Sequence, residues 1–134
     1  MKRVFADTSY WIALFNPRDE LHHKAVEASQ KFPELATTEM VLVEFLNAFS
    51  DRGPRLRAAA SRAVTVLRAS APVSVTPQTS EQFERALSRY NDRPDKNWSL
   101  TDCASFLMME AESIEDALTH DQHFVQAGFR ALLR

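Results

Sequence analysis

Two aspartates follow apolar segments at positions where parallel α/β proteins commonly bind ligands. Asp7 comes directly after residues 4–6, and Asp121 comes shortly after residues 117–119. Both segments are expected to be buried strands, and the ligand crevice of an open parallel sheet lies outside the carboxyl ends of its strands. Asp7 and Asp121 are therefore candidate ligands at one edge of a sheet. The alternative is that each caps the helix that follows, because aspartate is a preferred N-cap residue.

Two further acids lie on expected helices that are rich in apolar side chains. Glu44 interrupts the apolar run of residues 40–46, where a carboxylate must find a cation, a hydrogen-bond network or a proton. A buried salt bridge is the alternative for Glu44. Glu39 competes less well, because acids in a first helical turn interact favourably with the helix dipole. Asp102 stands three residues after Ser99, a capping-box spacing that offers a purely structural role.

Together, Asp7, Glu44, Asp102 and Asp121 form a candidate metal site. Clustered carboxylates repel one another, and a hard divalent cation is the usual compensation. Mg²⁺ prefers oxygen ligands and keeps several waters. One or two such ions can activate a water, orient a phosphodiester and stabilise the leaving oxygen, so that no histidine or lysine is required as a base. The acids therefore predict metal-dependent phosphoryl-transfer chemistry.

Short strands alternating with helices are expected to position these acids. The expected strands cover residues 3–6, 35–37, 73–76, 115–119 and 129–133. The expected helices cover residues 10–15, 19–31, 39–50, 54–69, 80–90, 101–112 and 122–127. This alternation indicates an α/β fold with a parallel sheet covered on both faces. With no repeat or linker, residues 1–134 are expected to form one domain.

The bulk composition is that of a globular protein. The chain has 134 residues, of which 45% are hydrophobic and 25% charged, which argues against disorder and membrane burial. The net charge of −2 gives no overall basic surface, so a nucleic acid would have to be held by a local patch and by metal. No run reaches the roughly 20 apolar residues of a membrane span, and we expect no membrane association.

Glycine and cysteine usage narrows the possibilities further. Gly53 and Gly128 are the only glycines, which argues against glycine-rich phosphate loops and dinucleotide fingerprints. Cys103 is the only cysteine, so an internal disulfide and a thiolate-only zinc site are both excluded. A reduced, cytoplasmic setting suits this usage.

Several motifs in order along the chain resemble those of PIN domains, and within that superfamily those of the VapC toxins of bacterial and archaeal toxin–antitoxin pairs. The matching segments are Asp7-Thr8-Ser9, Val43-Glu44-Phe45-Leu46-Asn47, Ser99-Leu100-Thr101-Asp102-Cys103, Thr119-His120-Asp121-Gln122-His123-Phe124 and the tail from Gln126 to Leu133. Each fragment is weak evidence by itself. Their order and spacing make the resemblance specific, and it spans almost the whole chain.

The resemblance implies a PIN-like three-layer fold with a short, mostly parallel sheet of about four to five strands. It implies a metal-dependent endoribonuclease that cuts single-stranded regions of RNA and uses Mg²⁺ or Mn²⁺. By the same resemblance, Asp7, Glu44, Asp102 and Asp121 are the acidic quartet, and Thr119 orients a ligand or water behind them. A homodimer and a cognate antitoxin protein that blocks the site are the implied partners.

Competing enzyme classes fit less well. An aspartyl phosphatase would carry a second aspartate two positions after the first, where this chain has Ser9. A receiver-like domain would offer a late lysine at a strand end, but the last lysine, Lys96, lies in an expected loop. A non-catalytic binding module, including a PIN-like RNA-binding module, remains open if the acids merely cap helices.

Some polar and aromatic residues carry weaker hypotheses. A zinc site built from His22, His23, His120 and His123 is disfavoured because their spacing matches no familiar zinc motif. The basic residues that could follow an RNA backbone are Arg55, Arg57, Arg62, Arg68, Arg93 and Lys96. Trp11 and Phe15 are expected in a core or dimer contact, whereas Trp98 could pack or stack on a base.

Overall fold

A five-stranded parallel sheet is the centre of the molecule. The structure is a computed structural model that describes residues 2–134. Its strands are β1 (Val4–Ala6), β2 (Leu35–Thr38), β3 (Val73–Thr76), β4 (Asp116–Leu118) and β5 (Arg130–Ala131). Their order is β3-β2-β1-β4-β5, and every pairing is parallel. The expected α/β fold with a short parallel sheet is confirmed.

The strand order creates a crevice at the middle of the sheet. β1 pairs with β2 on one side and with β4 on the other. The chain leaves β1 toward β2 but leaves β4 toward β5, so the two connections diverge from neighbouring strands. Such a topological switch point is where open parallel sheets bind ligands. The carboxyl ends of β1 and β4 are thus the place to look for a site.

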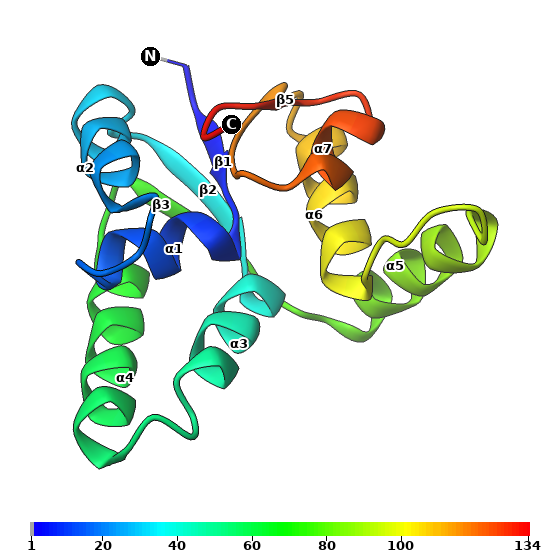
Figure 1. The fold of residues 1–134 in the computed structure, drawn as a ribbon. Coiled ribbons are helices and arrows are strands. Elements are labelled where there is room, and N and C mark those ends of the chain that lie inside the picture. Colours follow the sequence, from blue (N-terminus) through cyan, green and yellow to red (C-terminus); the bar gives the residue numbers. More distant parts are fainter. Residues whose placement is uncertain (1) are drawn as a thin grey trace.

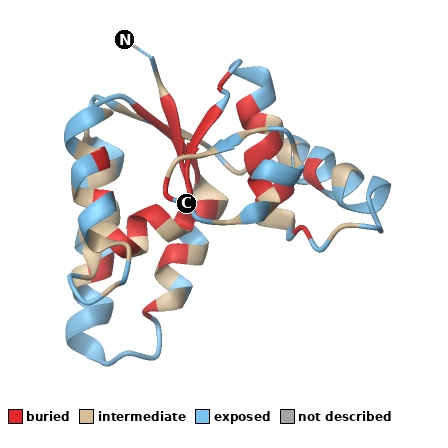
Figure 2. Ribbon diagram, turned by 45° about the horizontal axis from the view of Figure 1, so that its top comes forward, coloured by how far each residue is buried: buried red, intermediate tan, exposed pale blue. Residues whose placement is uncertain are grey.

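Helices cover both faces of the sheet and complete three layers. On one side lie α1 (Thr8–Phe15), α2 (His22–Lys31), α3 (Glu39–Ala48) and α4 (Pro54–Ala69) (Figure 1). On the other side lie α5 (Ser80–Asp92), α6 (Leu100–Ala111) and α7 (Gln122–Gln126). Burial is concentrated in the central strands and in the helix faces that touch them (Figure 2).

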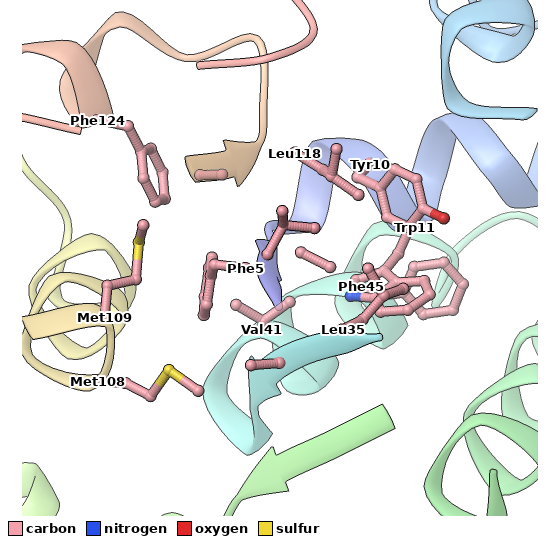
Figure 3. Close-up of a cluster of buried hydrophobic side chains, with 14 of the residues drawn as sticks. Phe5, Tyr10, Trp11, Leu35, Val41, Phe45, Met108, Met109, Leu118 and Phe124 are labelled. Carbon is pink, nitrogen blue, oxygen red and sulfur yellow. The ribbon is translucent and has the colours of Figure 1, made fainter. Parts of the chain in front are cut away.

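Aromatic packing fixes α6 and α7 against the central strand. The ring of Phe124 lies 6.1 Å from that of Phe5 and 5.0 Å from that of Phe106, measured between centroids. All three side chains are fully buried, and Met109 packs in the same cluster (Figure 3). Burying a phenylalanine stabilises the fold by about 1.5–3 kcal/mol. This packing sets where the amino ends of α6 and α7 lie.

A second aromatic cluster fixes α3 against α1. The ring of Phe15 lies 5.6 Å from that of Phe45 and 5.0 Å from that of Phe49. Trp11 is also buried here, and its Nε1 donates a hydrogen bond to Thr37 at 3.5 Å. Of the core and dimer contacts expected for these two residues, the core contact is present: Trp11 is buried in the core and the partly buried Phe15 packs against it. The contact packs the last turn of α1 against the second half of α3 and its C-cap residue.

Several expected element bounds differ from those in the structure, and two of them have a clear physical reason. The helix expected over residues 19–31 begins at His22, because Asp19 forms a turn instead. Its Oδ1 accepts a hydrogen bond from the Leu21 amide at 2.9 Å, and its carbonyl accepts one from the His22 amide at 3.0 Å. The final strand, expected over residues 129–133, is limited to Arg130–Ala131. Ladder pairing with β4 covers only these two residues.

Helix α5 buries less of its apolar face than its spacing predicts. Phe83, Leu87 and Tyr90 lie along one side at helical spacing, but they are 42%, 36% and 50% exposed. Ala86 is the only fully buried residue of this helix. We call Phe83, Leu87 and Tyr90 the α5 stripe. Within residues 2–134, no helix is long and apolar enough to cross a membrane.

Candidate active site

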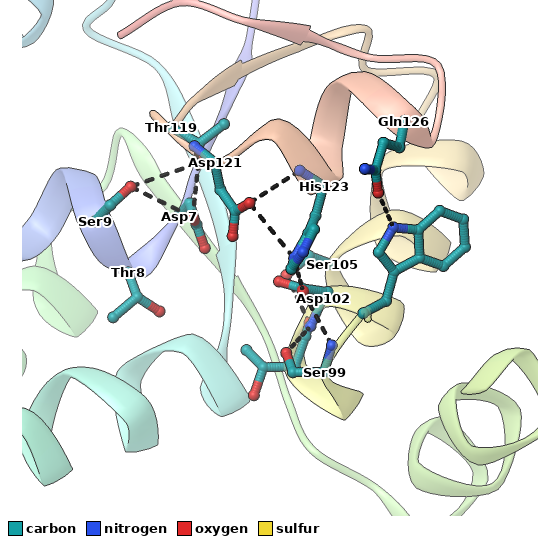
Figure 4. Close-up of polar contacts among 12 residues, drawn as sticks. Asp7, Thr8, Ser9, Ser99, Asp102, Ser105, Thr119, Asp121, His123 and Gln126 are labelled. Atoms are coloured by element: carbon teal, nitrogen blue, oxygen red, sulfur yellow. Dashed lines mark hydrogen bonds and ion pairs between the residues drawn. The ribbon is translucent and has the colours of Figure 1, made fainter. Parts of the chain in front are cut away.

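Asp7 lies at the carboxyl end of β1 with its side chain almost completely buried. It is 7% exposed and occupies the N-cap position of α1, yet its carboxylate makes no cap hydrogen bond. Instead, Oδ2 accepts a hydrogen bond from Thr119 Oγ1 at 2.8 Å and a longer one from Ser9 Oγ at 3.4 Å (Figure 4). Helix capping therefore does not explain Asp7.

The surroundings of Asp7 strongly favour its protonated form. Burial raises the pKa of Asp7 from 3.8 to about 7, and the hydrogen bond from Thr119 only partly opposes this. The negative charges of Asp102 and Glu44 raise the pKa of Asp7 further. A cation at this place would reverse these effects, because it stabilises the ionised carboxylate.

Glu44 projects from α3 toward the first turn of α1. Its Oε1 accepts a hydrogen bond of 2.6 Å from Thr8 Oγ1, and the residue is half-buried. Among residues 2–134, no Lys, Arg or His forms a salt bridge with Glu44, so the buried salt bridge considered for it is absent. Glu39 behaves differently: it accepts the Gln78 amide at 2.6 Å and pairs with Arg68 at 3.6 Å. Of the two, only Glu44 raises the pKa of Asp7.

Asp102 has the structural role that its spacing suggested and lies in the acid cluster as well. Its amide donates to Ser99 Oγ and its Oδ2 accepts from the Ser99 amide, both at 3.0 Å, which completes a capping box at the start of α6. The side chain is buried. Burial raises the pKa of Asp102, and the nearby charge of Asp121 adds to this, whereas the Ser99 amide and His123 oppose it.

Asp121 is also a cap that faces the cluster. Its Oδ1 accepts the His123 amide at 2.9 Å at the start of α7. The Asp121 amide donates to Thr119 Oγ1 at 3.0 Å, and the same hydroxyl donates to Asp7. The fully buried Thr119 thus links the two strand-end acids.

His123 belongs to the site and was missed from the sequence. Its Nδ1 lies 3.0 Å from Asp102 Oδ2 and 3.4 Å from Asp121 Oδ1 (Figure 4). Sequence reasoning tested the histidines only against zinc motifs. The signal that could have found His123 is its place two residues after a capping aspartate, because this cap folds the chain back toward that carboxylate. His120, in contrast, is exposed.

The four acids come together from four separate parts of the chain. Asp7 follows β1, Glu44 lies on α3, Asp102 begins α6, and Asp121 lies between β4 and α7. The charges of Asp102 and Glu44 raise the pKa of Asp7, and the charge of Asp121 raises the pKa of Asp102. Two of these carboxylates, Asp7 and Asp102, are buried. Ligand atoms of Asp102, Asp121 and His123 lie within 4.8 Å of one another. Carboxylate oxygens placed in this way fit a hard divalent cation.

A polar cavity adjoins the cluster at the start of α6. Its volume is about 410 Å³, and its lining is formed by Tyr90, Arg93, Pro94, Lys96, Asn97, Trp98 and Ser99. Trp98 is not free to stack on a base. It is buried, its ring lies 5.0 Å from that of Phe106, and its Nε1 donates to Gln126 Oε1 at 3.1 Å. Arg93 and Lys96 give the lining of this cavity a positive charge.

Fold and site together define the class of protein. The profile of the PIN domain matches residues 4–130, and the chain belongs to the PIN-domain family. The 23S rRNA-specific endonuclease VapC20 of Mycobacterium tuberculosis is 35% identical over 130 residues, which span 94% of this chain and 95% of VapC20. The resemblance to VapC toxins expected from the sequence is therefore confirmed.

Solved structures agree with this assignment. The crystal structure of Mycobacterium tuberculosis VapC20, described as a sarcin-ricin loop cleaving toxin, matches with a TM-score of 0.82 and 32% identity, covering 94% of this chain and 95% of that one. FitAcB from Neisseria gonorrhoeae matches with a TM-score of 0.69 at 12% identity, covering 96% and 94% of the two chains. The similarity to FitAcB is a similarity of fold alone.

The raised pKa of Asp7 predicts how stability depends on pH without metal. The folded protein holds the Asp7 proton more tightly than the unfolded chain does, so the free energy of unfolding should fall as pH rises from about 4 to about 7. In EDTA, Asp7→Asn should remove this loss and raise Tm above that of wild type by about 5 °C or more near pH 8. The difference should shrink toward pH 4.

Thermal melts across this pH range test the expectation, with Asp51→Asn as the control because Asp51 is an exposed aspartate outside the site. An Asp7→Asn protein whose Tm follows pH as that of wild type does would contradict it.

Proposed function

We propose that this protein is a metal-dependent endoribonuclease of the VapC type and acts as the toxin of a toxin–antitoxin pair. What supports the proposal best is the placement of Asp7, Asp102 and Asp121 near the switch point of the sheet, with Glu44 close enough for its charge to raise the pKa of Asp7. The 35% identity to VapC20, a ribosomal RNA endonuclease by name, supports RNA as the substrate. The whole of residues 1–134 acts as one nuclease domain in this proposal.

The four acids are the proposed ligands of Mg²⁺, for which Mn²⁺ can substitute. A metal held by these acids would supply activation of a water and stabilisation of the leaving oxygen of the phosphodiester. The remaining residues hold the acids in place. Thr119 orients Asp7, Thr8 orients Glu44, and Ser99 orients Asp102 through its backbone amide. These donors are neutral and leave the negative charge of the site available to a cation.

The polar cavity beside Ser99 is the proposed path of the RNA backbone. Arg93 and Lys96 line it, and phosphates are attracted by such cations even though the protein carries a net charge of −2. Arg93 is held by Asp95, whose carboxylate oxygens accept two hydrogen bonds of 3.0 Å. A phosphate could take the place of Asp95 on this exposed arginine.

The proposed partner is a cognate antitoxin protein that blocks the acid cluster in the cytoplasm. Free access of RNA to a nuclease of this type would damage the host, so inhibition by a protein follows from the toxin assignment. The likeness to VapC20, described as a toxin, supports this part of the proposal.

RNA cleavage should depend on divalent metal and on the acids. Excess EDTA should abolish cleavage of single-stranded RNA, and Mg²⁺ or Mn²⁺ should restore it. Asp7→Asn and Glu44→Gln should each lower kcat/KM by about 100-fold or more, because each removes a ligand charge. Gel analysis and sequencing of the RNA ends measure the result.

Glu39→Gln is the matched control, because Glu39 lies on the same helix as Glu44 but bonds to Gln78 and Arg68. Its cleavage rate should stay within about twofold of wild type. Full cleavage in excess EDTA would refute the metal mechanism, and wild-type activity of Asp7→Asn would remove that residue from the site.

Expression in bacteria without the partner should arrest growth. The arrest should be absent with Asp7→Asn and relieved when the small neighbouring gene that encodes the antitoxin is co-expressed. Growth curves with parallel checks of soluble protein test this. Unchanged growth despite soluble wild-type protein would count against the toxin role while leaving the nuclease activity to the cleavage assay.

A homodimer is the proposed oligomeric state, in line with the family resemblance, and the α5 stripe offers an exposed apolar surface for it. Leu87→Glu should then shift the molar mass from dimer to monomer in light-scattering measurements, because a buried charge without a partner opposes association. Val66→Glu on α4 is the control, since Val66 is 70% exposed outside the stripe. Dimer loss in Val66→Glu but not in Leu87→Glu would place the interface on the α4 side.

A further inference from the structure

His123 is the nitrogen ligand available to the acid cluster. We propose that His123 binds the same divalent cation as Asp102 and Asp121, forming a mixed oxygen and nitrogen site that favours Mn²⁺ over Mg²⁺. This inference rests on the proposed metal-dependent function and adds a residue outside the acidic quartet. It also specifies which metal the site selects.

The spacing of the three side chains suits a shared cation. Asp102, Asp121 and His123 each offer a ligand atom, and these atoms all lie within 4.8 Å of one another. The two distances from His123 Nδ1, 3.0 Å to Asp102 and 3.4 Å to Asp121, are those of neighbouring ligands. Two ligands at right angles, each about 2.1 Å from a cation, lie about 3 Å apart. Little movement of the side chains is therefore required.

The backbone explains why the imidazole faces the carboxylates. Asp121 Oδ1 accepts the His123 amide at 2.9 Å, so the first turn of α7 holds His123 on the same side as the carboxylate. Phe124, the next residue, is completely buried and anchors the turn against Phe5 and Phe106. Rigid placement of this kind is what a metal ligand needs.

The two tautomers of the imidazole permit both a metal-free and a metal-bound role. Without metal, Nδ1 can carry the proton and donate to Asp102. A neutral imidazole can instead carry its proton on Nε2 and leave the Nδ1 lone pair free for a cation. His123 is partly exposed, with 24% of its side chain accessible, so solvent can exchange that proton.

The chemistry of imidazole sets the expected selectivity. Mg²⁺ is a hard cation that prefers oxygen and retains its waters. Imidazole suits transition metals, and a site with one nitrogen ligand gains affinity for them relative to an all-oxygen site. Removing the nitrogen should therefore weaken Mn²⁺ binding more than Mg²⁺ binding.

The test uses the purified full chain with Mn²⁺ alone and no RNA. Electron spin-echo envelope modulation detects ¹⁴N bound directly to Mn²⁺, and it should report a histidine nitrogen in wild type. His123→Asn should abolish this signal, whereas its amide can still donate to Asp102. The preference for Mn²⁺ over Mg²⁺, measured by competitive titration, should fall by about tenfold or more in His123→Asn.

His120→Ala is the matched control, because His120 also neighbours Asp121 but is exposed. It should keep the nitrogen signal and the metal preference of wild type. Melting curves in EDTA establish that both variants are folded.

Absence of a nitrogen signal in wild type, or its persistence in His123→Asn, would overturn the assignment of His123. The proposed nuclease function would survive that result if wild type still cleaved RNA with Mg²⁺. Conversely, a nitrogen signal in a protein that cleaves no RNA would overturn the nuclease function while leaving His123 as a metal ligand.

Discussion

The burial of Asp7 is the constraint on which the rest of the structure depends. Asp7 follows the central strand of the sheet, its amide donates to the Leu118 carbonyl at 3.2 Å, and its carboxylate accepts a hydrogen bond from Thr119. Burial and the nearby charges of Asp102 and Glu44 make its ionised form unfavourable. The buried apolar strands and the aromatic clusters stabilise the fold and offset this local destabilisation. Functional sites often reduce stability in this way.

The choice of hydrogen-bond donors around the acids preserves their charge. Among residues 2–134, no Lys or Arg forms a salt bridge with the four acids, whereas Asp116, a buried acid away from the site, pairs with both Lys2 and Arg130. The acids of the site receive hydroxyl or amide donors instead, apart from the His123 contacts. A lysine there would neutralise the charge and occupy the place of a cation. Neutral donors orient a carboxylate and leave its charge available.

The sequence predicted the order of the elements well, because hydrophobic periodicity and strand-end acids are local signals. The strand at residues 73–76 and the helix at residues 54–69 have the predicted bounds, set by Pro72, Pro77 and the Gly53-Pro54 pair. Other features depend on distant contacts. The exposure of the α5 stripe could not be read from helical spacing, since spacing does not reveal whether a partner covers a face. His123 was missed because its distance to Asp102 depends on how α7 packs against α6.

Capping and metal binding were treated as alternatives for the aspartates, but the geometry makes them compatible. In Asp102 the capping box and the His123 contact both use Oδ2, and in Asp121 the cap uses Oδ1. The second oxygen of each carboxylate receives no hydrogen bond from residues 2–134. A cap fixes the rotamer of its side chain, since one oxygen must stay on the helix amide. The whole carboxylate, including the capping oxygen that lies near His123 Nδ1, is thereby held in a defined direction before any cation arrives, which lowers the entropy lost on binding. A capping aspartate that faces a crevice is thus a pre-oriented ligand, and evidence that it caps a helix is no evidence against a role in the site.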